Sequence, residues 1–116
     1  MTWKLFIDDE RNPIDVTWGS WQDQALYREN EWLIARSWDE VLELVVSLGF
    51  PQMISFDHDL GDNTRNGYEI AQKLCDMVLD GVEMPKDFRF LVHSKNPVGA
   101  ENIRKYMDNF LKHWGN

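Results

Sequence analysis

The chain is poor in cysteine, in long apolar runs and in positive charge, and each shortage excludes a class of protein. Cys75 is the single cysteine, so no disulfide can form within the chain, which favours a cytoplasmic protein. No apolar run approaches the roughly 18 residues of a membrane span, and the first residues lack a signal-peptide pattern. Lysine and arginine number 12 against 20 aspartates and glutamates, a formal net charge of −8. This argues against membrane partners and broad nucleic-acid binding, but allows a small anionic ligand held by a few cations.

The composition is that of one globular domain. Of the 116 residues, 43% are hydrophobic and 28% are charged, which suits a single folded unit with one ordinary core. No repeat, low-complexity tract or linker divides the sequence. We therefore expect one domain over residues 1–116.

Short apolar runs alternate with segments of helical periodicity. The runs, which predict buried strands, cover residues 3–7, 32–35, 53–56 and 88–92. Helices are predicted after a capping box at Ser37 and Glu40, after Asn66, and from about Val98. Strands that alternate with helices predict an α/β fold, with an open parallel sheet of about four strands and helices on both faces.

Residues 12–30 fit this pattern least. They contain Trp18, Trp21 and Tyr27 with poor periodicity. We interpret them as a long irregular connection with a short helix or hairpin. A connection this long in a compact domain is often functional.

Carboxylates follow two of the predicted strands. Asp8 and Asp9 follow the first, and Asp57 and Asp59 follow the third. In an open parallel sheet these ends meet at the ligand-binding edge. Two carboxylates about 5 Å apart repel by roughly 3 kcal/mol at an effective dielectric of about 20, so protons or a cation must offset them. The sequence predicts that these four aspartates, with Asp62 as a further candidate, bind Mg²⁺ or Mn²⁺.

Other polar residues at the same predicted edge suit proton transfer and phosphate binding. His58 and His93 are candidates for general acid and base near neutral pH, together with Asp59. Because His58 lies between two aspartates, strand alternation leaves open that its side chain points to the opposite face. The candidate phosphate-binding residues are Arg11, Arg36, Ser94 and Asn96.

The order of these residues resembles the receiver domains of two-component response regulators. The pair Asp8-Asp9 ends the first strand, Gly67 follows Asp59 by eight residues, and Ser94 lies at the position of the receiver's Thr/Ser switch. The resemblance implies a three-layer, flavodoxin-like fold. It also implies Mg²⁺ on Asp8, Asp9 and Asp59, with Asp59 as the phospho-acceptor.

The predicted elements also depart from a full receiver. The last strand–helix unit, which carries the receiver's lysine, is missing, and Lys95 fits that role only if the strand at 88–92 is taken as the last one. A helix between the first two strands is not evident either. Both departures weigh against a phospho-acceptor function.

A closer resemblance covers nearly the whole chain. Asp-His-Asp-Leu-Gly at 57–61, His-Ser-Lys-Asn-Pro at 93–97, and the segments 6–13 and 34–37 are similar to the cyclic-phosphate-processing receiver domains of bacteria and phages. This resemblance implies an activity on cyclic phosphates of nucleotides or RNA ends. The segment of about 16–30 resembles an insertion, which would serve as a lid or a partner surface.

Three functions remain open. The sequence favours a metal-dependent phosphoesterase acting on a small phosphate ester or nucleotide. The second is a non-catalytic module that binds a protein through the Trp-rich 16–30 segment, or a nucleotide. The third is a phospho-acceptor domain with Asp59 as the acceptor.

Overall fold

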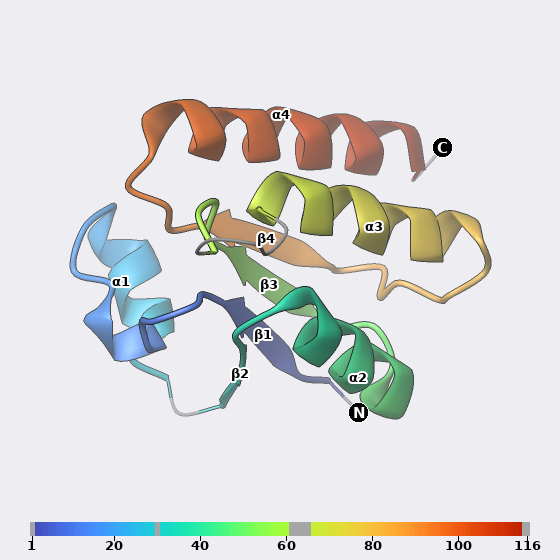
Figure 1. Cartoon of the computed structure of the whole chain (residues 1–116), viewed down its shortest axis with the longest axis horizontal. Helices are drawn as coiled ribbons and strands as arrows, with labels where there is room; N and C mark the ends of the chain where they lie inside the picture. The colour runs from blue at the N-terminus through green and yellow to red at the C-terminus, as the bar shows by residue number, and fades with distance from the viewer. Residues whose placement is uncertain (1, 30, 61–65, 115–116) are drawn as a thin grey trace.

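The computed structural model describes residues 2–29, 31–60 and 66–114, and its centre is a four-stranded parallel sheet (Figure 1). The strands are β1 (Lys4–Ile7), β2 (Trp32–Ala35), β3 (Met53–Phe56) and β4 (Arg89–Val92). Their order across the sheet is β2-β1-β3-β4, and every neighbouring pair is parallel. This is the flavodoxin-like, receiver-like order. The described residues contain no fifth strand, so the predicted fold is confirmed, including its missing last unit.

Helices connect the strands, and one more helix follows the last strand. They are the 3-10 helix η1 (Pro13–Asp15), α1 (Trp21–Tyr27), α2 (Trp38–Leu48), α3 (Gly67–Leu79) and α4 (Pro97–Trp114). The predicted caps hold, because the side chains of Ser37 and Asn66 accept hydrogen bonds from the backbone N–H groups three residues on. The carboxylate of Glu40 accepts from the N–H of Arg36, one residue before the cap, so the predicted capping box closes on the preceding residue.

The two sheet faces carry separate clusters of apolar side chains. On one face, residues such as Leu5, Ile54 and Phe56 pack against α2, α3 and α4. On the other face, Phe6 packs with Tyr27 of α1 and with neighbouring apolar residues. Figure 1 shows α3 and α4 side by side over the sheet and α1 apart from them. Helices cover both faces in this way because the right-handed crossover from β1 to β2 runs one way across the sheet, whereas those from β2 to β3 and from β3 to β4 run the other way.

The segment 12–30 supplies the cover of the second face. It contains η1 and α1, and residues from it, including Val16 and Tyr27, are buried against Phe6. The short helix expected there is present, although α1 has only seven residues. No helix among the described parts of the chain combines the length and the apolar character that crossing a membrane requires.

Candidate metal and phosphate site

Three buried polar side chains meet where three neighbouring strands end. Asp8, Asp57 and His93 are the first residues after β1, β3 and β4. The sheet register continues through them, since the N–H of Asp57 donates to the Ile7 carbonyl and that of His93 to the Phe56 carbonyl. One potential ligand atom from each of the three lies within 4.8 Å of the others. The strand ends therefore bring two carboxylates from distant parts of the sequence together.

Asp8 is fully buried and surrounded by donors. Its Oδ1 accepts from the backbone N–H groups of Glu10 and Arg11, both at 2.8 Å, and its Oδ2 lies 3.0 Å from His93 Nε2. Burial alone would raise the pKa of Asp8, but the hydrogen bonds from His93, Arg11 and Glu10 outweigh it and lower the pKa to about 2. Asp8 is therefore a carboxylate at neutral pH.

His93 belongs to a buried chain of hydrogen bonds that ends at Asp8. Its Nδ1 lies 2.6 Å from Ser55 Oγ, and Ser55 Oγ lies 2.6 Å from the Tyr27 hydroxyl. One arrangement gives every donor an acceptor: Tyr27 donates to Ser55, Ser55 to Nδ1, and Nε2–H to Asp8. Burial raises the pKa of Tyr27, which keeps its phenol protonated. The ring of Phe6 stacks on the imidazole with the ring centroids 4.3 Å apart. This stacking and the hydrogen bonds of the two ring nitrogens together fix the orientation of His93.

Ionisation is less favourable at Asp57 than at Asp8, the other buried carboxylate of the site. Its Oδ1 accepts from the N–H of His58 at 2.9 Å. Burial, and then the charge of Asp8, raise its pKa. Burial and the charge of Asp8 also raise the pKa of Asp9, which is half-buried nearby. Both carboxylates would gain from a bound cation.

The donor set fits a hard divalent cation. The nitrogens of His93 are engaged by Ser55 and Asp8, so the carboxylates of Asp8 and Asp57 are the groups suited to hold an ion. Oxygen ligands of this kind suit Mg²⁺ or Mn²⁺, and Mg²⁺ usually keeps several waters. A cleft of about 300 Å³ opens beside them and has room for such waters and a phosphate group.

Charged and polar side chains line this cleft. The lining residues are Asp8, Asp9, Glu10, Arg11, Asp57, Asp59, Ser94, Lys95 and Asn96. All four aspartates predicted as metal ligands are among them, as are three of the four predicted phosphate-binding residues. Asp62 lies outside the described residues.

Arg36 is the predicted phosphate-binding residue that does not line the cleft. Its guanidinium donates to the carbonyls of Asp8 and Arg11 and to the side chain of Asn12. In the structure Arg36 therefore supports the loop that follows β1, and so the backbone N–H groups that bind Asp8.

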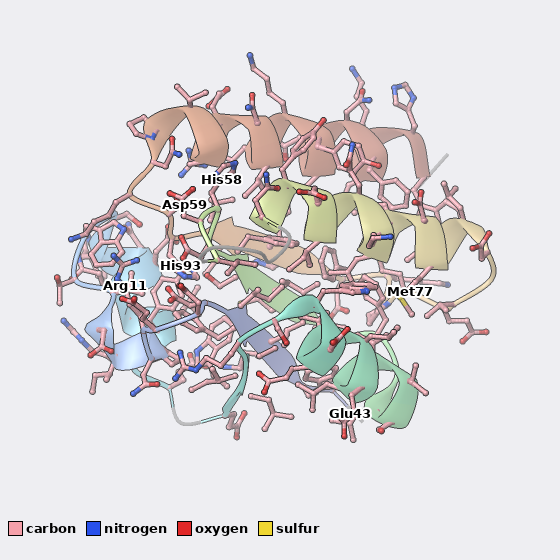
Figure 2. All side chains as sticks on the ribbon, in the orientation of Figure 1. Arg11, Glu43, His58, Asp59, Met77 and His93 are labelled. Carbon is pink, nitrogen blue, oxygen red and sulfur yellow. The ribbon has the colours of Figure 1, made fainter. Side chains whose placement is uncertain are left out.

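His58 and Asp59 form a separate pair at the rim. His58 Nδ1 lies 2.9 Å from Asp59 Oδ1, and the Asp59 side chain is 71% exposed. The His58 ring lies against Gly99 of α4, so close that a Cβ added at Gly99 would meet it at 2.3 Å. Figure 2 shows His58 and Asp59 toward the start of α4, apart from His93 and Arg11. The side chain of His58 thus lies on the opposite face of the sheet, which is the alternative that strand alternation left open.

Ser94 and Asn96 shape the loop between β4 and α4. Asn96 Oδ1 accepts from the N–H of Gly99 and caps α4, while Ser94 Oγ accepts from the N–H of Asn96. Their side chains are therefore already engaged by the backbone where they line the cleft. A ligand at this edge would meet the capped start of α4.

Sequence reasoning gave no place in this site to Ser55, Tyr27 or Trp18. Ser55 carried a usable signal, because it is a polar residue within an apolar strand and shares a face with Asp57 two residues on. Tyr27 and Trp18 carried no such signal, because they come from the segment with the weakest hydrophobic periodicity. Lys95 lay beside predicted site residues but was weighed only as a stand-in for the receiver's lysine.

The family model of the cyclic-phosphate processing receiver domain matches residues 3–109. The chain belongs to this family. The match spans both acidic strand ends, the segment 16–30 and His93, and so confirms the resemblance inferred from the motifs.

A solved structure supports the fold independently. The chain is similar to a fusion that carries the yeast Spc42 trimeric coiled coil, amino acids 181–211, with a TM-score of 0.52 and 22% sequence identity. The similarity covers 90% of this chain and 62% of that one, so this chain spans less than two thirds of the length of that fusion. At this identity the likeness shows the fold alone. No curated protein is similar enough to count as a match.

Proposed function

We propose that this family member binds Mg²⁺ or Mn²⁺ at Asp8 and Asp57 and hydrolyses a phosphate ester, such as a cyclic phosphate of a nucleotide or RNA end. The observation that carries the proposal is the approach of Asp8, Asp57 and His93 to within 4.8 Å beside an open cleft. Asp9 and Asp59 line the same cleft and would complete the metal site directly or through water. The single cysteine, Cys75, is buried in the core and free, which suits a cytoplasmic setting.

The residues around the cleft have distinct roles in this proposal. A bound divalent cation would polarise a phosphoryl oxygen and make a bound water more acidic. Arg11, with Ser94 and Asn96, would hold the phosphate oxygens. His93 keeps Asp8 oriented through Nε2–H. The hydrogen-bonded pair of His58 and Asp59 is the candidate for proton transfer at the rim.

The test is ring opening of a 2′,3′-cyclic nucleotide, followed by phosphorus NMR in the presence of Mn²⁺. We expect the cyclic phosphate signal to be replaced by that of a monoester, and Asp57→Asn to abolish the change. Asp108→Asn, which removes an exposed carboxylate from α4, is the matched control and should behave as wild type. If no member of a panel of cyclic phosphates opens with Mn²⁺ or Mg²⁺, the hydrolytic proposal is wrong.

A protein-binding role has its own supporting observation. Trp21 is 74% exposed and Ile14 is 69% exposed, and both belong to the connection between β1 and β2. Exposed large apolar side chains on one connection suit a partner surface. Pull-down with wild type and with Trp21→Ser tests this role. Equal recovery of partners by both proteins would count against it.

The phospho-acceptor role is the third candidate. The exposed Asp59 carboxylate is accessible to a phosphodonor, whereas Asp57 is the aspartate that lies within 4.8 Å of both Asp8 and His93. An intact-mass shift with a small phosphodonor and Mg²⁺, lost in Asp59→Asn, would support this role. No shift under those conditions would exclude acceptance from that donor.

A further inference from the structure

One indole contacts both cations of the cleft. Trp18 belongs to the stretch between η1 and α1 and is half-buried. Its Nε1–H donates to the main-chain carbonyl of His93 at 2.8 Å. This bond joins the connection after β1 to the end of β4, and so fixes the indole beside the cleft.

Arg11 and Lys95 both lie on this ring. Lys95 Nζ is 4.4 Å and Arg11 Cζ is 5.1 Å from the Trp18 ring centroid. These distances are within the range of cation–π attraction. The two cations come from different loops, one after β1 and one after β4, and Trp18 is the contact they share. Both also line the cleft.

The charge around the cleft makes this arrangement unusual. Five carboxylates line the cleft against the two cations. The Arg11 guanidinium lies 3.7 Å from Asp8 Oδ2, yet within the described residues no carboxylate lies at ion-pair distance from Lys95 Nζ. The ammonium group of Lys95 is thus held over an aromatic ring although carboxylates surround it. Its charge stays available to an anionic ligand.

We propose that Trp18 is the positioning residue for the ligand's phosphate. It holds Arg11 and Lys95 as a pair of cations at the mouth of the cleft before the ligand arrives. Preorganised cations lose less freedom on binding than free side chains do, so the ring strengthens phosphate binding without touching the metal ligands. The identity of the anion as a phosphate rests on the proposed function, whereas the holding of the two cations does not.

The experiment measures two affinities on the full chain by calorimetry, for Mn²⁺ alone and for inorganic phosphate at saturating Mn²⁺. Trp18→Leu should weaken phosphate binding about tenfold and leave Mn²⁺ affinity unchanged. Trp18→Phe keeps an aromatic face without the N–H and should stay within about threefold of wild type. Trp114→Leu, at the exposed tryptophan that ends α4 away from the cleft, is the matched control. Lys95→Gln should weaken phosphate binding to the same extent as Trp18→Leu.

A second readout does not depend on any ligand. In wild type, the ring current of Trp18 should move the NMR signals of the Lys95 side-chain methylenes upfield, and Trp18→Leu should remove that shift while the protein stays folded. Unshifted Lys95 signals in wild type, or wild-type phosphate affinity in folded Trp18→Leu, would overturn the inference. Equal losses in Trp18→Phe and Trp18→Leu would also overturn it, because the hydrogen bond to His93 would then explain them.

The two proposals fail separately. Phosphate binding that depends on Trp18 without Mn²⁺ binding would leave the positioning role standing and remove the metal site. If wild type binds Mn²⁺ but does not bind phosphate, the metal site stands and the positioning role of Trp18 is wrong.

Discussion

Asp8 and Asp57 are the same residue type a few ångströms apart, but their surroundings shift their pKa values in opposite directions. Asp8 receives hydrogen bonds from two backbone N–H groups and from His93. Asp57 is buried next to the charge that these donors stabilise. In the metal-free protein one carboxylate therefore stabilises the fold, while the other is costly when it ionises.

Asp8→Asn is expected to destabilise the metal-free protein in a pH-dependent way. The pKa of Asp8 falls from 3.8 to about 2 on folding. A lowered pKa stabilises the native state above the unfolded value, here by about 2 kcal/mol, and that contribution is lost as the pH falls toward 2. Urea unfolding with EDTA at pH 6 and pH 2.5 measures it. If the free energy of unfolding of Asp8→Asn lies below that of wild type by the same amount at both pH values, this prediction is wrong.

Asp57→Asn is expected to stabilise the metal-free protein at neutral pH. Because folding raises the pKa of Asp57, its ionised form costs stability at neutral pH, and the cost disappears as the pH falls below that pKa and the native carboxyl takes up a proton. Without metal, the variant should be more stable than wild type at pH 7 and should lose this advantage at low pH. The same unfolding series provides the comparison. A loss of stability at pH 7 in EDTA would contradict the repulsion between Asp57 and Asp8.

The buried chain of hydrogen bonds predicts an order of costs. Ser55→Ala removes the partner of both His93 Nδ1 and the Tyr27 hydroxyl, so it should cost about 2–3 kcal/mol. Tyr27→Phe removes only the terminal hydroxyl and should cost about 1 kcal/mol. Chemical unfolding of both variants measures the difference. If Tyr27→Phe lowers the free energy of unfolding more than Ser55→Ala does, the hydrogen bonds do not run from Tyr27 through Ser55 to His93.

The sequence reveals individual site residues where strand ends carry them. Asp8, Asp57 and His93 directly follow apolar runs, so parallel pairing alone brings them to one edge. The role of Arg36 was harder to foresee, because a guanidinium reaches carbonyls as readily as phosphates and only the loop geometry decides. Likewise, nothing in the sequence distinguishes a His93 that transfers protons from one that holds Asp8.

At the scale of elements, the turn after β3 depends on a glycine at the start of α3. A Cβ at Gly67 would lie 1.7 Å from the Asp57 carbonyl oxygen, and the Gly67 N–H donates to the His58 carbonyl at 2.8 Å. The first residue of α3 thus packs directly on the backbone that carries Asp57. The position of α3 and the position of Asp57 are therefore coupled.

Gly67→Ala should cost about 3 kcal/mol or more and weaken Mn²⁺ binding, because backbone atoms must move to accept the methyl group. Gly49→Ala is the control: its φ of +84° and ψ of 179° lie in a region that is essentially restricted to glycine, but the space around it is open, so about 1–3 kcal/mol of backbone strain is expected. Thermal unfolding and Mn²⁺ calorimetry on both variants test this. Equal Mn²⁺ affinity in wild type and folded Gly67→Ala would contradict the coupling.

The sequence predicts the strands well and α1 poorly, for one reason. Each strand is a short and mostly apolar run, and such a run is visible in the sequence even where the strand is only partly buried, as β4 is. α1 has seven residues, of which only Tyr27 is buried and Leu26 is partly buried, so no stripe of helical spacing can develop. Its residues are fixed by the face they cover, which is a tertiary effect.

At the scale of the whole molecule, the strand order creates the site. With β1 and β3 as central neighbours, their carboxyl ends lie side by side, and β4 adds His93 from the next position. The alternation of strands and helices predicts a parallel sheet, the resemblance to receiver domains implies this order, and the family match from residue 3 to residue 109 agrees with it. The connection from β1 to β2 then covers the second face and delivers Tyr27 and Trp18 to the same edge.

The most direct test of the account is a titration of the full chain with Mn²⁺, followed by the electron paramagnetic resonance signal of the free ion. We predict that wild type removes one ion per chain from solution, that Asp108→Asn does the same, and that Asp57→Asn removes none. If wild type leaves the free-ion signal unchanged, or if Asp57→Asn binds Mn²⁺ as wild type does, then the two buried aspartates do not form a cation site.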